Sequence, residues 1–194
     1  MSYSNCNIGI LGGTFDPAHY GHVEISTHAY KSMGLDQIWW LVTSKNPIKG
    51  QSLNSFADRV AESKNITKNI PYIKIYENNL NLKTNYTSEL VKKLTNKYSR
   101  TNFVWIMGAD NLVTFHKWHK FDDILNNIPI AVIDRNSYRK DALKSQTAVK
   151  YSSSFINNSD AKILPLLKPP AWTYLDIKTL DISSTKIRES SSSN

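Results

Sequence analysis

The stretch from Gly12 to His22 constrains this chain more than any other feature. Residues 7–11 (NIGIL) have the pattern of a short buried β-strand, and residues 12–22 (GGTFDPAHYGH) follow it directly. Gly12 and Gly13 lack a Cβ atom, so their backbone can adopt a positive φ and an anionic ligand can approach main-chain N–H groups closely. A strand, a glycine turn and a helix start in this order predict a phosphate-binding turn.

The second half of the stretch supplies the groups that would bind an anion. Pro17 fixes φ and Asp16 can accept hydrogen bonds from nearby backbone N–H groups, so the pair is expected to close the turn. His19 and His22 are three positions apart, and in a helix that begins near Ala18 both imidazoles lie on one face of the first turn. That turn also presents unpaired N–H groups and the positive end of the helix dipole, which favour phosphate.

The order of patterns along the chain indicates an α/β protein with a doubly wound parallel sheet of the Rossmann-like kind. Helical patterns at 23–33, from Ser55 onward and at 88–98 alternate with apolar runs. We expect one domain over residues 1–194, with a surface excursion containing some helix at 136–161 and a frayed tail at 189–194. The expected strands are 7–11, 37–42, 72–76, 103–107, 128–133 and 171–175.

Composition restricts the compartment and the partners. The longest apolar runs fall well short of the ~20 residues that cross a bilayer, and no export signal is visible at the N-terminus, so we expect no membrane association. Cys6 is the only cysteine, which excludes an internal disulfide and fits a reducing cytoplasm. The net charge of +8 is spread along the chain, which favours a small polyanionic substrate or ordinary solubility over nucleic acid.

Two further segments have the residue types that bind a nucleotide. Gly108 and Asp110 follow the unbroken apolar run 103–107, at the carboxyl end of an expected central strand; Asp110 could equally be a helix N-cap. Ser183, Ser184 and Thr185 begin a helical segment in which Arg188 follows one turn later, and these groups can donate to phosphate oxygens.

On these motifs the chain resembles the nucleotidyltransferase superfamily, and nicotinate-nucleotide adenylyltransferases in particular. The motifs are GGTFDPxHxGH at 12–22, a second signature ISSTxIR at 182–188, Gly-Ala-Asp-Asn at 108–111 and Asn-Pro-x-Lys at 46–49. Asn85-Tyr86-Thr87 is similar to a family segment that lines the nicotinate pocket, although Glu89-Leu90 stands where the family usually has a Thr-Leu pair. The resemblance covers about residues 7 to 188.

The resemblance implies transfer of AMP from ATP to nicotinate mononucleotide, which gives the deamido dinucleotide and pyrophosphate. The attacking phosphate oxygen is already anionic, so the reaction needs cations and N–H donors rather than a general base, with Mg²⁺ held by the phosphates. The residue type of Trp118 by itself indicates a position in the hydrophobic core. The resemblance implies instead that Trp118 stacks on the pyridine ring, as the equivalent Trp of the family does. The implied catalytic residues are His19, His22, Lys49 and Arg188. The implied ATP site adds Gly12, Gly13, Thr14, Phe15, Gly108, Asp110, Ser183, Ser184 and Thr185, and the implied acceptor site consists of Thr14, Asn46, Lys49, Tyr86, Thr87, Trp118 and Arg135.

Several alternatives stay open on sequence alone. The acceptor could be nicotinamide mononucleotide, phosphopantetheine or glycerol phosphate, although Pro17-Ala18 argues against the cytidylyltransferase branch. Two alternatives are not enzymes of this kind. One is a nucleotide-binding sensor without turnover, and the other is a basic nucleic-acid-binding protein. His116 and His119 have the i, i+3 spacing of metal ligands, but no Cys or carboxylate pattern beside them supports a zinc site. Oligomeric state is not predicted.

Overall fold

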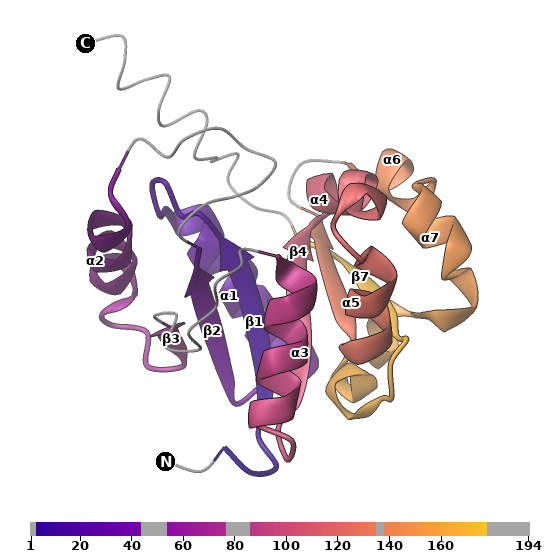
Figure 1. Ribbon diagram of the computed structural model, residues 1–194, viewed down its shortest axis with the longest axis horizontal. Coiled ribbons are helices and arrows are strands. Elements are labelled where there is room, and N and C mark those ends of the chain that lie inside the picture. The colour runs from indigo at the N-terminus through magenta and orange to yellow at the C-terminus, as the bar shows by residue number, and fades with distance from the viewer. Residues whose placement is uncertain (1–2, 44–53, 77–85, 135–137, 178–194) are drawn as a thin grey trace, which may run out of the picture.

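The fold is a seven-stranded parallel sheet with helices on both faces (Figure 1). A computed structural model describes residues 3–43, 54–76, 86–134 and 138–177. The strand order is β3-β2-β1-β4-β5-β7-β6, and every pairing is parallel, which confirms the predicted doubly wound sheet. The strands are β1 (Asn7–Gly13), β2 (Gln37–Val42), β3 (Ile73–Tyr76), β4 (Asn102–Gly108), β5 (Ile130–Asp134), β6 (Phe155–Ile156) and β7 (Trp172–Asp176).

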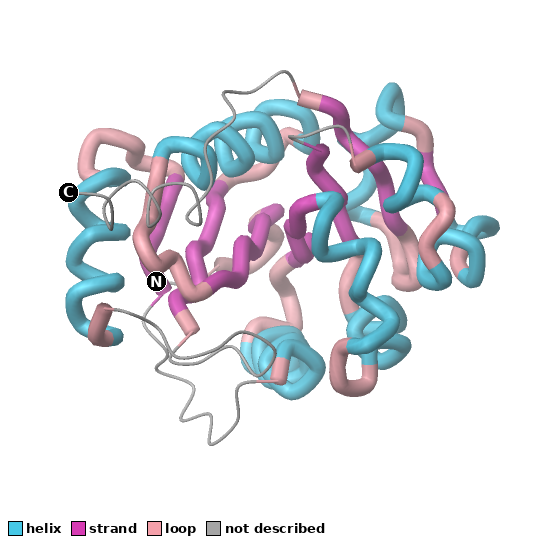
Figure 2. Tube along the Cα trace, turned by 90° about the horizontal axis from the view of Figure 1, so that it is seen from above, coloured by secondary structure: helices cyan, strands magenta, loops and turns pink. Residues whose placement is uncertain are grey.

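Each face of the sheet buries its own core, and Figure 2 shows the sheet between the two helical layers. α1, α2 and η3 cover one face, where Ile25, Ala29 and Met33 of α1 pack on the strands. The other helices with buried apolar side chains cover the opposite face, where Leu90 and Leu94 of α3 are buried. The helices are α1 (Tyr20–Met33), α2 (Phe56–Thr67), α3 (Thr87–Lys97), α4 (Ala109–Thr114), η1 (Phe115–Lys117), α5 (Phe121–Asn127), α6 (Arg139–Leu143), α7 (Gln146–Lys150), η2 (Ser152–Ser154) and η3 (Asn158–Leu166).

Local signals account for where the first helices begin and end. Ser55 is the N-cap of α2, and its hydroxyl accepts a hydrogen bond from the Asp58 N–H at 3.2 Å, as expected of a Ser cap. Gly34 ends α1 in the left-handed conformation at φ 60°, which is the expected glycine stop. The start of α1 differs slightly from the prediction, because His19 is the N-cap and the first helical residue is Tyr20.

The segment predicted as a surface excursion, 136–161, is in part a structural layer, so that expectation was wrong in this respect. Where it is described, it contains short helices and also β6, which pairs with β7 at the edge of the sheet. Ala142, Ala148 and Ala161 of this segment are buried. Small buried residues separated by polar ones give little hydrophobic periodicity, which explains why the sequence pattern missed this packing.

Gly12 permits close packing at the centre of the sheet. A Cβ atom on Gly12 would lie 2.5 Å from Cη2 of the buried Trp105 on β4. The glycine is therefore required by the fold itself, independently of any ligand.

We expect Gly12→Ala to lower the free energy of unfolding by about 1–3 kcal/mol, the usual cost of overpacking a core. Gly13→Ala is the matched control, because its Cβ would meet only the edge of the Phe15 ring, at 3.3 Å. Urea unfolding of both variants measures the difference, and equal stability of Gly12→Ala and the native protein would contradict this account of the packing.

Candidate active site

The residues of the first motif and the segment from Gly108 to Asp110 lie at the carboxyl ends of two parallel strands, β1 and β4. From the adjacent central strands β1 and β4 the chain continues in opposite directions, to β2 after β1 and to β5 after β4. In an open α/β sheet such a reversal leaves a crevice between the two strand ends, and ligands bind there. The turn that follows Gly13 and the α4 start after Gly108 both lie at this position (Figure 1).

The turn after β1 has its positive φ at Phe15 rather than at a glycine. Gly12 and Gly13 are the last two residues of β1, and among the described glycines only Gly34 has a positive φ. Phe15 has φ 49°, an uncommon value for an aromatic residue. The expectation that the two glycines supply this conformation is therefore wrong. Their role is steric, since Gly12 accommodates Trp105 and Gly13 faces the Phe15 ring.

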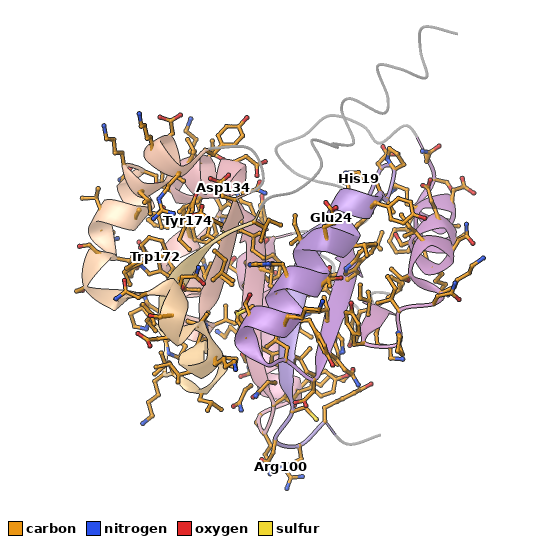
Figure 3. The ribbon with its side chains drawn as sticks, turned by 180° about the vertical axis from the view of Figure 1, so that it is seen from behind. His19, Glu24, Arg100, Asp134, Trp172 and Tyr174 are labelled. Carbon is orange, nitrogen blue, oxygen red and sulfur yellow. The ribbon has the colours of Figure 1, made fainter. Side chains whose placement is uncertain are left out.

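His19 and His22 lie together at the start of α1, as predicted; Figure 3 labels His19 at this helix end. Their ring centroids are 3.9 Å apart, and Nδ1 of His22 accepts a hydrogen bond from the His19 backbone N–H at 3.2 Å. His19 is buried and His22 is half-buried. The two imidazoles are therefore held side by side at the positive end of the helix dipole.

The hydrogen bond to Nδ1 determines what His22 can offer a ligand. A backbone N–H can only donate, so Nδ1 of His22 accepts and carries no proton in this arrangement. The proton of the neutral ring is then on Nε2, which makes Nε2 a hydrogen-bond donor. The same bond fixes the orientation of the His22 ring relative to the His19 backbone.

Aromatic packing fixes the backbone beneath His22. Phe15 stacks on Trp40 of β2 with ring centroids 4.8 Å apart and an interplanar angle of 16°, and the His22 ring lies 4.8 Å from Phe15. Trp40 Nε1 donates to the Ser26 hydroxyl at 2.7 Å, and that hydroxyl donates to the His22 backbone carbonyl at 2.8 Å. The turn, the helix start and the second strand thus form one packed unit.

Arg59 of α2 is a residue that the sequence reading missed. It is 1% exposed, and its Nη1 donates to the carbonyls of Thr14 and of Thr43, the latter at 2.8 Å. Burial lowers the pKa of Arg59, and the nearby Asp16 carboxylate raises it. Arginine in a helix is usually exposed, so its residue type does not predict burial. Its position in the helix does indicate burial, because Arg59, Ser63 and Thr67 recur every four residues along the buried face of α2.

Asp16 links the turn to the beginning of α2. Its Oδ1 accepts hydrogen bonds from the Asn54 side chain at 2.8 Å and from the Asn54 backbone N–H at 3.3 Å. This donor lies 38 residues away in sequence, so the pattern of the turn does not predict it. The side chain is 4% exposed.

At the end of β4, Gly108 rather than Asp110 is the N-cap of α4, so the N-cap interpretation of Asp110 was wrong. Asp110 is exposed in the first turn of this short helix. A Cβ atom on Gly108 would collide with Oδ1 of Asp110, which shows that the carboxylate folds back over the glycine.

The two segments expected to bind the pyridine ring are in contact with each other. One is the start of α3 and the other is the loop after η1. Tyr86 is the N-cap of α3 and Thr87 is its first residue. The Tyr86 ring stacks on His119 with centroids 4.2 Å apart and an interplanar angle of 28°. Trp118 is partly buried, and its ring packs edge-on against Phe115 at 5.0 Å. The sequence spacing of His119 relates it only to His116, and its contact with Tyr86 arises from tertiary structure.

The remaining predicted residues lie outside the described part of the chain. They are Asn46, Lys49, Arg135, Ser183, Ser184, Thr185 and Arg188. Within the described ranges, no three His, Cys, Asp or Glu side chains are grouped so that they could hold a metal ion. No helix in the same ranges is long and apolar enough to span a membrane.

A buried carboxylate lies at the end of β5, directly before the predicted Arg135. Asp134 Oδ2 accepts a hydrogen bond from the Tyr174 hydroxyl at 2.7 Å, and its Oδ1 accepts one from the Tyr138 N–H at 3.2 Å. Figure 3 shows Asp134 and Tyr174 at the same end of the sheet as His19. Burial, together with the hydrogen bond to Asp134, raises the pKa of Tyr174 above its ordinary value.

Comparisons with known proteins agree with this arrangement. Residues 10–190 match the family described as cytidylyltransferase-like. A Rhizobium johnstonii protein named probable nicotinate-nucleotide adenylyltransferase is 39% identical over 186 residues, covering 95% of this chain and 93% of the relative. A Methylorubrum extorquens protein of the same name is 39% identical over 182 residues, covering 93% and 98%. The solved Plasmodium falciparum nicotinic acid mononucleotide adenylyltransferase complexed with NaAD has a similar fold, with TM-score 0.71 at 21% identity, covering 95% of this chain and 83% of that one.

We expect Tyr174→Phe to lower the free energy of unfolding at pH 7 by about 1–3 kcal/mol, because the buried Asp134 carboxylate loses a donor. In the native protein the folded state keeps the Tyr174 proton above pH ~10 while the unfolded state releases it, so stability falls as pH rises there. Urea unfolding between neutral and alkaline pH should show a shallower fall in Tyr174→Phe, by up to about 1.4 kcal/mol per pH unit. Parallel pH profiles for the two proteins would contradict this.

Proposed function

Because the chain belongs to the cytidylyltransferase-like family, and within it to the nicotinate-nucleotide adenylyltransferases, we propose that it transfers AMP from ATP to nicotinate mononucleotide. The products are nicotinate adenine dinucleotide and pyrophosphate, and the reaction belongs to NAD biosynthesis. The observation that carries the proposal is the His19–His22 pair at the N-terminus of α1, directly after the central strand β1, in a chain 39% identical to proteins of that name.

The reaction is a single displacement at the α-phosphorus of ATP. An oxygen of the mononucleotide phosphate forms the new bond to phosphorus, the bond to the β-phosphate oxygen breaks, and pyrophosphate leaves with that electron pair. The nucleophile is already an anion, so no group has to remove a proton from it. The barrier arises from repulsion between two polyanions and from charge that accumulates on the phosphoryl oxygens and the leaving group.

The described residues match that requirement. Nε2–H of His22, the adjacent His19 and the backbone N–H groups at the start of α1 are donors held in place before the ligand binds, which is the condition for electrostatic stabilisation of a transition state. Lys49 and Arg188 are proposed to add positive charge. Mg²⁺ is proposed to enter with ATP, because triphosphate oxygens and water supply the octahedral shell that it prefers.

The acceptor is proposed to bind between the start of α3 and the loop after η1. Tyr86 is 41% exposed there and stacks on His119, so an aromatic surface is available to a planar ring. Thr87, Trp118 and, beyond the described residues, Asn46 and Arg135 complete the proposed acceptor site. Gly108 and Asp110 at the end of β4 are proposed to contact the nucleotide of ATP.

The acceptor is tested by offering purified protein, ATP and Mg²⁺ with nicotinate mononucleotide, nicotinamide mononucleotide or phosphopantetheine in separate reactions. Mass spectrometry of the products should show dinucleotide and pyrophosphate, with strong preference for the nicotinate acceptor. Turnover with another acceptor only would overturn the substrate assignment. Binding of ATP without turnover on any acceptor would favour a nucleotide sensor.

We expect His22→Ala to lower kcat roughly 10²- to 10³-fold, the range observed when one electrostatic donor is removed. The fold should persist, because the Ser26 hydroxyl bonds the backbone carbonyl of residue 22 rather than its side chain. His28→Ala, on the same helix, is the matched control and should keep native kcat. Retention of most of the activity by His22→Ala would remove His22 from the catalytic residues.

A further inference from the structure

We propose that Arg59 is a positioning residue that orients the Thr14–Phe15 peptide, so that the Phe15 N–H faces the phosphate groups of the ligand. This inference rests on the proposed function in one respect, namely that phosphate binds at the turn after β1. The proposal assigns a role in orienting the phosphate-binding turn to a residue of α2, which lies outside the motifs of that turn.

The first step is the burial of the guanidinium. Arg59 is 1% exposed, and a buried charge is tolerated only when polar partners compensate for the lost water. Its Nη1 donates to the Thr14 carbonyl in the turn and to the Thr43 carbonyl just after β2. The Asp16 carboxylate supplies the opposing charge, which raises the pKa of Arg59 against the effect of burial.

The second step follows from the planarity of the peptide bond. The Thr14–Phe15 peptide is not among the cis peptides of the chain, and in a trans peptide the C=O and N–H bonds point in opposite directions. Because the Thr14 carbonyl points at Arg59, the Phe15 N–H points away from Arg59. Arg59 thereby sets the direction of a donor that it does not contact.

The third step is the conformation of Phe15. A φ of 49° is unfavourable for an aromatic residue and persists only where the surroundings enforce it. The Trp40 stack holds the ring, and the Arg59 hydrogen bond holds the preceding carbonyl. Thr43 also joins the two segments directly, because its N–H and hydroxyl donate to the Gly13 carbonyl at 2.9 and 3.2 Å.

The choice of arginine over lysine is explained by the two acceptors. A planar guanidinium presents several N–H groups in a rigid arrangement, whereas an ammonium is a compact charge on a flexible stem. Lysine at this position would keep the charge beside Asp16 and would hold the two carbonyls less rigidly. A displacement of a donor by about 1 Å is enough to lower a rate substantially.

The test compares Arg59→Lys and Arg59→Met with the native protein. Arg100→Met is the control, because Arg100 is exposed at the end of the molecule opposite His19 (Figure 3). Thermal unfolding, kcat and KM for ATP are measured for all four proteins. We expect kcat to fall about 10-fold in Arg59→Lys and up to about 10²-fold in Arg59→Met, while KM for ATP changes less than kcat. Arg100→Met should match the native protein.

A second readout does not depend on turnover. Protein labelled with ¹⁵N-phenylalanine contains six Phe residues, and the Phe15 amide can be assigned by Phe15→Leu. On titration with inorganic pyrophosphate and Mg²⁺, we expect the Phe15 amide resonance to shift in the native protein and in Arg100→Met, and to shift much less in both Arg59 variants.

The inference is overturned if Arg59→Lys keeps kcat within about twofold of native, or if the Phe15 amide responds equally to pyrophosphate in all proteins. It is also overturned if Arg59→Met unfolds and folded Arg59→Lys behaves as native, since Arg59 would then serve stability alone.

The experiment distinguishes failure of the proposed function from failure of the proposed role of Arg59. If the native protein forms no dinucleotide but its Phe15 amide shifts and the shift is lost in the Arg59 variants, the function is wrong and the role of Arg59 stands.

Discussion

The left-handed conformation of Phe15 is the constraint on which the site depends. An aromatic residue does not adopt φ 49° by preference, so neighbouring elements must compensate for it. β2 contributes the Trp40 ring against Phe15, and α2 contributes the Arg59 guanidinium to the preceding carbonyl. Two segments far away in sequence, β2 and α2, therefore contact the Thr14–Phe15 peptide, and that peptide leads the chain from β1 into α1.

The start of α1 concentrates several donors of the site in a few residues. The His19 N–H donates to Nδ1 of His22. This one hydrogen bond caps the helix end and also determines which ring nitrogen of His22 acts as the acceptor. Capping stabilises the helix end, and with Nδ1 as the acceptor the neutral His22 ring carries its proton on Nε2. The helix dipole reinforces both roles because it favours negative charge at this point.

The parallel sheet explains why distant motifs come together. Parallel strands end on one edge, so the segments after β1 and β4 and the last residue of β5 lie on the same side, although helices separate them in the sequence. The two buried cores pack on opposite faces of the sheet that carries this edge, with α1, α2 and η3 on one face and α3 to α7 on the other. On the second face, the Tyr86–His119 stack joins the start of α3 to the loop after η1.

The sequence by itself determined the fold class, six of the seven strands, the His19–His22 pair and the family, because these depend on local periodicity and on an ordered motif. Tertiary structure decided which residue takes the positive φ, since Gly12 is needed beneath Trp105 and Phe15 is stabilised by contacts from other elements. It also decided that Arg59 bonds the Thr43 carbonyl, that Asp16 bonds Asn54, and that His119 lies on Tyr86. These are contacts between residues distant in sequence, and neither residue type nor spacing encodes such partners when only one chain is read.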